Sequence, residues 1–143
     1  MNSLLVSDTH FTNNPRDAYR WGLFSWLREA IPKHGVKYLF ILGDLCEEKD
    51  RHPAQLVNKV VDELLLVYKQ TGLTEIYIIR GNHDGLDPNT SFFKFLGKYP
   101  CIKFIETPFS APFNGREVLM LPHTTTPADA WKNVEMDRAD YIF

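Results

Sequence analysis

Acidic, amide and imidazole side chains follow three short apolar runs of the sequence, each at the point where the run ends. Asp8 and His10 follow the first run, Asp44 follows the second, and Asn82 and His83 follow the third. Carboxylate and imidazole groups together suit divalent ions such as Mn, Fe or Zn. The residue types therefore predict a divalent metal site assembled from distant parts of the chain.

These side chains differ in what they can offer to metal ions. Asp8 and His10 are two positions apart and can meet one ion, whereas the two oxygens of the Asp44 carboxylate can bridge two ions. Asn82 offers a neutral carbonyl oxygen to the second ion. Two ions roughly 3.5–4 Å apart clamp a phosphoryl group and activate a water molecule. The chemistry that this set predicts is hydrolysis of a phosphoester bond.

Two further residues beside the predicted ligands fit a proton-transfer role. His83 is adjacent to Asn82, and a neighbouring imidazole can protonate a leaving oxygen as a general acid. Glu47 follows Asp44 by three positions and can hold that imidazole in its tautomer and orientation. Each motif alone also fits an ordinary polar turn. The metal site is favoured because three polar clusters occur in order, each after an apolar run.

The clusters converge only if the apolar runs are parallel strands of one sheet. Strands are expected at residues 2–7, 37–42 and 75–79, separated by helical segments, so that each step is about one βα unit of roughly 30 residues. The β-α-β-α-β order implies parallel strands, and the absence of alternation implies that both faces are covered. Ligand sites of such sheets lie outside the carboxyl ends of the strands. An α/β fold with the site at that edge is therefore predicted.

Two amphipathic helices are expected between these strands. The first starts at Asn14-Pro15 and ends near Pro32, and the second starts near Pro53 and ends at Gly72. The predicted buried face of the first helix comprises Tyr19, Leu23, Trp26, Leu27, Ala30 and Ile31. That of the second comprises Leu56, Val57, Val60, Val61, Leu64, Leu65 and Tyr68. In the less regular second half, short helices are expected near residues 91–96 and 127–133, and short strands at 102–105, 109–113, 118–121 and 140–143.

The three polar clusters resemble the motifs of the calcineurin-like metallophosphoesterases. That family has D-x-H, then G-D-x-x-[D/E/H], then G-N-H-[D/E], followed by a lone His and by G-H-x-H. The first three motifs are present here as Asp8-Thr9-His10, Gly43-Asp44-Leu45-Cys46-Glu47 and Gly81-Asn82-His83-Asp84. The resemblance implies a βαβαβ layered sheet with helices packed on it. It also implies two divalent metal ions, with Mn favoured over Fe or Zn.

The resemblance assigns a role to each of these motif residues. Asp8 and His10 would bind the first ion, Asp44 would bridge the two ions, and Asn82 would bind the second ion. His83 would be the proton donor, and Glu47 the residue that orients it.

One part of the family pattern is not found in this sequence. No G-H-x-H is present, and the only histidine after His83 is His123, which we expect on a surface loop. Residues 140–143 resemble the strand before the family's lone histidine. We therefore expect residues 1–143 to form a single, C-terminally incomplete metallophosphoesterase domain with two or three metal ligands missing and little or no activity. An open sheet edge near Phe143 favours a homodimer.

Within the family, residues 43–53 resemble the SbcD-like DNA-repair exonucleases. Lys49, Arg51, His52 and Arg80 are expected near the site entrance, where they either contact a phosphate backbone or form a solvated rim. The leading hypothesis is hydrolysis of DNA phosphodiesters. A small-molecule phosphatase or cyclic-nucleotide phosphodiesterase would use the same residues. The alternative from another class is a non-catalytic protein-binding scaffold on the same fold.

The composition excludes several other classes of protein. A net charge of −2 excludes a strongly basic protein that coats nucleic acid, and 44% hydrophobic with 24% charged residues is typical of a globular domain. No apolar run approaches the length of a bilayer span, and no secretory signal is expected. The two cysteines, Cys46 and Cys101, make no disulfide framework. We expect a reduced, cytoplasmic protein with no membrane partner.

Overall fold

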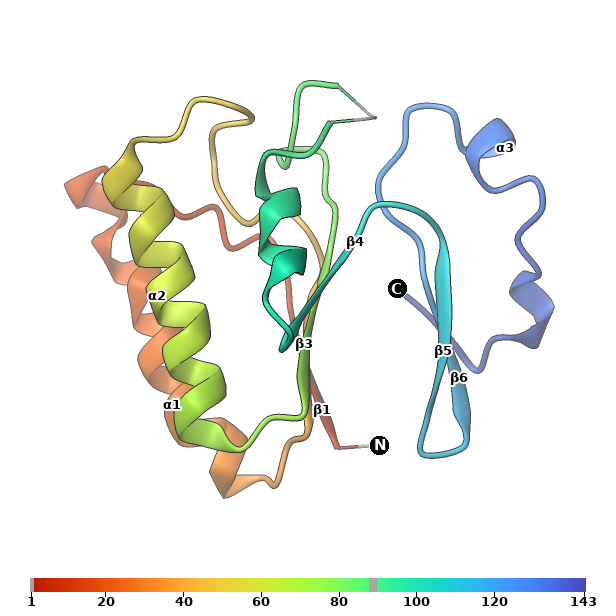
Figure 1. The fold of residues 1–143 in the computed structure, drawn as a ribbon, viewed down its shortest axis with the longest axis horizontal. Coiled ribbons are helices and arrows are strands. Elements are labelled where there is room, and N and C mark those ends of the chain that lie inside the picture. The colour runs from red at the N-terminus through yellow and green to blue at the C-terminus, as the bar shows by residue number, and fades with distance from the viewer. Residues whose placement is uncertain (1, 88–89) are drawn as a thin grey trace.

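A four-stranded parallel sheet forms the middle layer of the molecule, between a layer of helices and a second sheet (Figure 1). The computed structural model describes residues 2–87 and 90–143. The strands of the first sheet lie side by side in sequence order: β1 (Ser3–Val6), β2 (Tyr38–Ile41), β3 (Glu75–Ile79) and β4 (Ile102–Ile105). All neighbouring pairs are parallel, so the carboxyl ends of the strands share one edge. The predicted α/β fold is confirmed.

The helical layer covers one face of this sheet. It contains the 3-10 helix η1 (Pro15–Trp21), α1 (Gly22–Lys33), α2 (Ala54–Thr71) and the 3-10 helix η2 (Phe92–Lys98). As predicted, α2 begins after Pro53 and ends at Gly72, whose φ of 71° is the left-handed conformation that glycine favours at a helix end. Among the helices of the described residues, none combines the length and apolarity needed for a bilayer span.

The first predicted helix is divided into two parts. Asn14 caps it as expected, because its side-chain oxygen accepts a hydrogen bond at 3.1 Å from the N–H two residues later, but residues 15–21 form a 3-10 helix before α1 begins. A 3-10 helix has three residues per turn, so the spacing of an α-helix does not extend through it. The predicted burial of Tyr19 and Trp26 is wrong: these side chains are 73% and 50% exposed, and Phe24 is buried instead.

Both faces of the central strands β2 and β3 are buried, against different partners. Leu39 and Ile76 face the helices, whereas Phe40 and Tyr77 face the second sheet. The ring centroids of Phe40 and Tyr77 are 5.1 Å apart, and Phe113 of the second sheet packs edge-on against both rings. Burial on both faces explains why these strands are apolar without alternation.

The second sheet consists of β5 (Phe109–Phe113), β6 (Arg116–Met120) and the edge strand β7 (Tyr141–Ile142). β5 and β6 form a hairpin through Asn114-Gly115, whose φ angles of 50° and 76° suit a two-residue turn. The strand predicted at 109–113 has the predicted bounds. The strand expected at 118–121 is observed at 116–120, and the strand expected at 140–143 is limited to 141–142. The connection from β6 to β7 contains the short helices α3 (Pro127–Ala130) and η3 (Met136–Arg138).

Candidate metal centre

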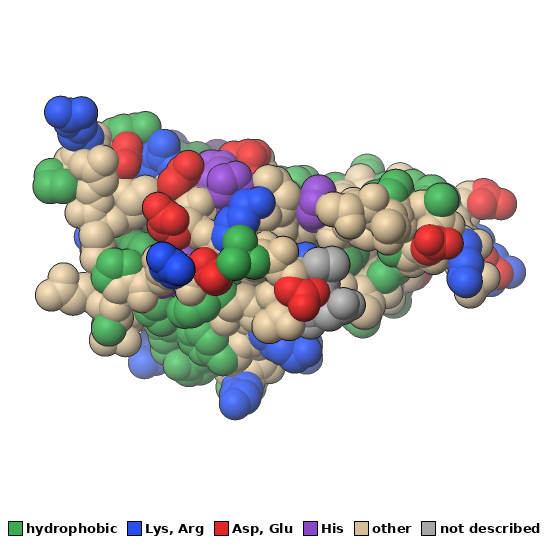
Figure 2. Space-filling view, turned by 90° about the horizontal axis from the view of Figure 1, so that it is seen from above, with side chains coloured by type: hydrophobic (Ala, Val, Ile, Leu, Met, Phe, Trp, Pro, Cys, Tyr) green, Lys and Arg blue, Asp and Glu red, His purple; other side chains and the backbone are tan. Residues whose placement is uncertain are grey.

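The chain segments that follow β1 and β2 stay joined beyond the regular strands. The N–H groups of His10 and Phe11 donate hydrogen bonds to the carbonyls of Asp44 and Leu45, at 2.9 and 3.0 Å. The buried Thr9 hydroxyl also donates to the Leu45 carbonyl, at 2.9 Å. These bonds bring the first two polar clusters together at the carboxyl edge of the sheet. Figure 2 views the molecule from this side and shows histidines on the surface among acidic and basic side chains.

Three of the predicted ligands have an unusual backbone conformation. Asp8, His10 and Asp44 have φ angles of 52°, 44° and 53°. Left-handed backbone is uncommon outside glycine and costs of order 1–3 kcal/mol per residue, so it persists only where the surrounding structure enforces it. The strained positions coincide with the residues whose side chains must face one another.

The Asp84 side chain connects the loop that follows β2 to the loop that follows β3. This side chain is fully buried, and one carboxylate oxygen accepts a hydrogen bond from the Leu45 N–H at 3.0 Å. The other oxygen accepts from the Asp44 N–H at 3.1 Å and from the Gly81 N–H at 2.7 Å. Burial raises the pKa of the Asp84 carboxyl, while the three backbone donors oppose that rise. Sequence analysis gave Asp84 no role, although the signal was present as the last residue of Gly-Asn-His-Asp.

Two glycines allow the loops that follow β2 and β3 to touch through their backbones. A Cβ on Gly43 would lie 2.7 Å from the Cα of Gly81, and a Cβ on Gly81 would overlap the Asp44 carboxylate. Both positions therefore exclude a side chain. Gly43 also has a φ of 88°, which only glycine adopts without strain. This close approach places Asp44 directly against the loop that carries Asn82.

The side chains of Asp8, His10 and Asp44 form a group that can hold a metal ion. Their donor atoms all lie within 4.8 Å of one another. The Nε2 atom of His10 is 3.8 Å from a carboxylate oxygen of Asp8 and 3.9 Å from one of Asp44. The second Asp44 oxygen accepts a hydrogen bond from the His83 N–H at 2.8 Å. Two carboxylates and an imidazole at this separation fit a divalent ion, and Asn82 lies in the adjoining loop.

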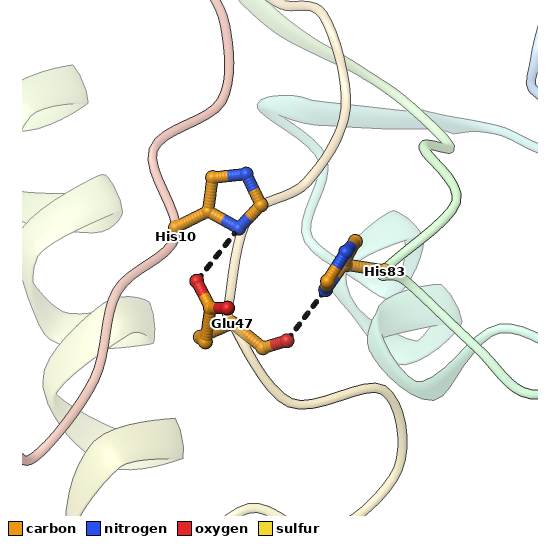
Figure 3. A group of neighbouring side chains, drawn as sticks. All are labelled: His10, Glu47 and His83. Carbon is orange, nitrogen blue, oxygen red and sulfur yellow. Dashed lines mark hydrogen bonds and ion pairs between the residues drawn. The ribbon is translucent and has the colours of Figure 1, made fainter.

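Glu47 contacts both imidazoles but does not orient His83 in the predicted way (Figure 3). Its main-chain carbonyl accepts a hydrogen bond from His83 Nδ1 at 2.6 Å, while its carboxylate lies 3.1 Å from His10 Nδ1. The reason is that the Glu47 N–H pairs with the Phe11 carbonyl at 3.3 Å, which continues the pairing of the two segments at this residue. Because a carbonyl only accepts, the contact assigns the proton of His83 to Nδ1.

The three cationic or imidazole residues predicted to bind substrate lie in different environments. Arg51 is exposed and lines a pocket of about 520 Å³ together with Glu47. His52 packs against the rings of Phe92 and Phe93, and burial lowers its pKa, which disfavours the cationic form. Only Arg51 therefore has the exposure expected of a rim residue.

Arg80 is buried at the carboxyl end of β3, not at a solvated rim. Its guanidinium donates to the carbonyls of His123 and Asp87, both at 3.4 Å, and its own carbonyl accepts from the His123 N–H at 2.8 Å. These contacts tie the loop after β6 to the first sheet. His123 itself is exposed, and it is not among the candidate metal ligands of the described residues.

The layered fold and the carboxylate–imidazole cluster at the strand ends define an α/β domain with a candidate metal site. The chain belongs to the calcineurin-like phosphoesterase family, whose sequence model matches residues 1–142. No curated protein matches the sequence significantly.

Two solved structures are similar to this chain. The first is the nuclease MPE of Pseudomonas putida, with 22% identity and a TM-score of 0.54 over 87% of this chain and 57% of the other. The second is a protein of unknown function from Aquifex aeolicus, with 18% identity and a TM-score of 0.47 over 87% of this chain and 61% of the other. The chain thus spans roughly three fifths of each structure, and the likeness to the nuclease shows the fold alone.

Proposed function

We propose that this protein is a metal-dependent phosphodiester hydrolase that uses two divalent ions, with Mn²⁺ as the first candidate and Fe or Zn as alternatives. The observation that carries the proposal is the convergence of Asp8, His10 and Asp44, whose donor atoms lie within 4.8 Å of one another. Membership of a phosphoesterase family gives this convergence its chemical meaning.

The ligands divide between the two ions according to their positions. Asp8 and His10 hold one ion, Asp44 is shared, and Asn82 contributes its amide oxygen to the second. Asp44 suits the shared role because it contacts both the first ligand pair and the loop of Asn82. When bound, the ions supply positive charge that offsets the charge developing on the phosphoryl oxygens.

His83 serves as the proton donor to the leaving oxygen. The Glu47 carbonyl holds one proton on Nδ1 of the ring, so the proton that the imidazolium form of His83 donates is the one on Nε2. The hydrogen bond from the backbone N–H of His83 to the Asp44 carboxylate keeps the imidazole next to the predicted metal ligands. A general acid must lie within hydrogen-bond reach of the reacting group, and the position of His83 beside Asp44 supports this role.

The charge around the cluster favours diesters over monoesters. Asp8, Glu47 and Glu48 are exposed carboxylates at or beside the site, and Arg51 is the exposed cation that shares a pocket with two of them. A phosphodiester carries one negative charge, whereas a monoester carries nearly two at neutral pH, so residual repulsion is weaker for the diester. We propose DNA as the diester substrate. The resemblance of residues 43–53 to the SbcD-like exonucleases supports this, and the fold shared with a structure named as a nuclease is compatible with it.

A panel of three substrates tests the proposal. Because the G-H-x-H motif of the family pattern is not found in this sequence, turnover with Mn²⁺ is expected to be slow. Any turnover is expected to be faster for bis-p-nitrophenyl phosphate and single-stranded DNA than for p-nitrophenyl phosphate, and Asp44→Asn is expected to abolish it. Preference for the monoester would contradict the diester assignment. Tight Mn²⁺ binding without turnover of any substrate would favour the non-catalytic scaffold.

We also propose that the protein self-associates through the edge strand of the second sheet. Tyr141 and Ile142 of β7 are both 48% exposed, and an apolar edge strand offers unpaired backbone groups to a second copy. Light scattering is expected to show a dimer, and a stable monomer over the micromolar range would contradict this.

A further inference from the structure

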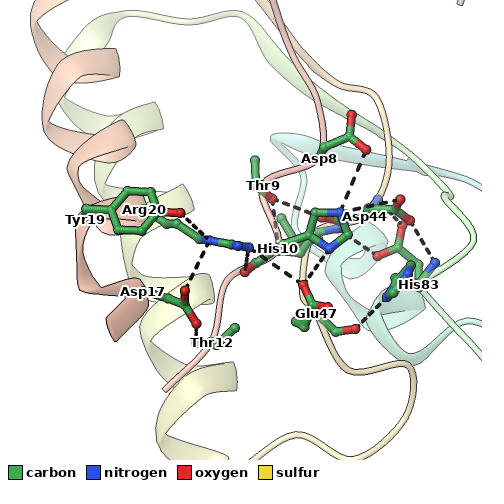
Figure 4. A network of polar contacts seen from close by, with 12 residues as sticks. Asp8, Thr9, His10, Thr12, Asp17, Tyr19, Arg20, Asp44, Glu47 and His83 are labelled. Carbon is green, nitrogen blue, oxygen red and sulfur yellow. Dashed lines mark hydrogen bonds and ion pairs between the residues drawn. The ribbon is translucent and has the colours of Figure 1, made fainter. Parts of the chain in front are cut away.

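Arg20, near the end of η1, contacts residues of the candidate metal centre from outside the group of predicted ligands (Figure 4). Its Nη1 atom donates a hydrogen bond to the main-chain carbonyl of His10 at 2.7 Å. The same atom lies 3.7 Å from the carboxylate oxygen of Glu47 that faces His10 Nδ1. One guanidinium therefore contacts both the backbone of a predicted ligand and the acid beside its ring.

The Arg20 side chain is itself held in place. Its Nε lies 3.8 Å from an Asp17 carboxylate oxygen and 3.4 Å from the Tyr19 hydroxyl. Asp17 in turn accepts a hydrogen bond at 3.0 Å from the Thr12 hydroxyl, two residues after His10. The side chain of Arg20 is only 27% exposed. This chain of contacts fixes the helical segment 15–21 against the loop that carries the first two ligands.

The two contacts of Arg20 act on different properties of His10. The hydrogen bond to its carbonyl supports a residue with a left-handed φ of 44°, a conformation that needs outside support. The positive charge of Arg20 favours the position of the Glu47 carboxylate 3.1 Å from His10 Nδ1, where the negative charge of the carboxylate favours a proton on Nδ1 and leaves Nε2 free to bind metal. A guanidinium can do both at once because it offers several donors in one plane.

We propose that Arg20 is a positioning residue for the metal ligand His10, acting through the His10 carbonyl and the Glu47 carboxylate without touching the substrate. This inference rests on the proposed metal-dependent function. It assigns to Glu47 a part in metal binding in place of the predicted contact between its carboxylate and His83.

Calorimetric titration of Mn²⁺ in the absence of substrate tests the inference. Arg20→Gln is expected to weaken Mn²⁺ binding by about 10–100-fold, the usual effect of removing a residue that orients a metal ligand. Arg20→Lys, which keeps the positive charge but not the planar guanidinium, is expected to lose less Mn²⁺ affinity. Arg16→Gln, at an exposed position of the same 3-10 helix, is the matched control and is expected to bind like the wild type.

Other results would overturn the inference. Wild-type Mn²⁺ affinity in Arg20→Gln would show that Arg20 does not position His10. A raised KM with unchanged metal affinity would show that Arg20 contacts the substrate instead. Urea unfolding of each variant separates loss of the site from loss of the fold, and an Arg20→Lys variant with wild-type stability and weaker binding would exclude a merely structural effect.

A metal-free measurement separates this inference from the proposed function. The ¹⁵N chemical shifts of the His10 ring are expected to show the Nδ1–H tautomer in excess in the wild type and a mixture in Arg20→Gln. If the wild type binds no Mn²⁺, the proposed function fails, while the tautomer comparison still decides whether Arg20 orients the ring. Identical tautomers in both proteins would contradict the role of Arg20.

Discussion

The carboxyl edge of the first sheet and the second sheet are built in opposite ways. At the carboxyl edge, three non-glycine residues have left-handed backbone and a buried carboxylate bonds three backbone N–H groups. In the second sheet, left-handed backbone occurs at the hairpin turn, where it is ordinary. Its ion pair, between Arg116 and Asp140, lies on the surface.

This difference indicates that the two regions do different work. The second sheet contributes apolar burial through residues such as Phe113 and Val118, which stabilises the fold without shaping the cluster. The carboxyl edge uses buried polar bonds to hold strained ligands, as functional sites commonly do. Stability and metal affinity should therefore respond to different substitutions.

The largest expected effect on stability comes from the second sheet. Phe113→Ala removes a buried ring that packs against Tyr38, Phe40 and Tyr77, and should lower the free energy of unfolding by about 3–5 kcal/mol. Urea denaturation measures this loss. Mn²⁺ affinity, measured where the variant is still folded, should stay within about twofold of the wild type, given that distant sites act almost independently. A tenfold loss of affinity would show that the two regions are coupled.

A smaller loss of stability, coupled to loss of metal binding, is expected for Asp84→Asn. The amide can accept at one end only, so at least one buried N–H loses its partner, at a cost of about 1–3 kcal/mol. Because those donors belong to the ligand loops, Mn²⁺ affinity should fall too. Asp62→Asn, at an exposed position of α2, is the control. Unchanged stability in Asp84→Asn would contradict the role given to this carboxylate.

Gly81→Ala tests the close approach of the two loops. The added Cβ would overlap the Asp44 carboxylate and backbone, so this substitution should cost about 1–3 kcal/mol and displace the central ligand. Gly22→Ala adds the same methyl group at a position with nothing within 4 Å, and should be neutral. If both variants matched the wild type in urea denaturation and Mn²⁺ titration, the packing of Gly81 against Asp44 would be refuted.

The smallest effect is expected at Asp140 on the second sheet. The Glu117 N–H and then the Arg116 guanidinium lower the pKa of the Asp140 carboxyl below its ordinary value. A lowered folded pKa means that the contribution to stability is present above the unfolded pKa and is lost as the pH falls through the folded pKa. Asp140→Asn should therefore be slightly less stable than the wild type at pH 7, and the difference measured by urea denaturation should shrink progressively as the pH is lowered below about 4. A difference that grows in acid would have the wrong sign.

Much of the fold could be predicted because the strands are strongly apolar. The strands at 75–79 and 102–105 have their predicted bounds, and α2 lies between its predicted start and stop residues. The first helix was harder to predict because an Asn-Pro start is compatible with either a 3-10 helix or an α-helix, and the local sequence does not select between the two. The structure has a 3-10 helix over residues 15–21 before the α-helix begins. That choice also decided that Phe24 is buried and Trp26 is not.

The site could be predicted as a set of residues but not as a set of contacts. Parallel strands require Asp8, His10 and Asp44 to meet at one edge, so spacing alone indicated the cluster. Spacing could not say that the Glu47 carboxylate faces His10, because this depends on the backbone pairing of Glu47 with Phe11. The role of Arg20 depends on the position of η1, and no local sequence pattern encodes it.

The most direct measurement is calorimetric titration of Mn²⁺ into the metal-free protein and into Asp44→Asn. Asp44 contacts the His10 ring and the His83 backbone, so its carboxylate lies between the ligands of the first loop and the loop of Asn82. We expect the wild type to bind Mn²⁺ and the variant to lose at least about 100-fold in affinity with little change in urea denaturation. Equal binding by the two proteins, or no binding by the wild type, would contradict a metal centre at the ends of these strands.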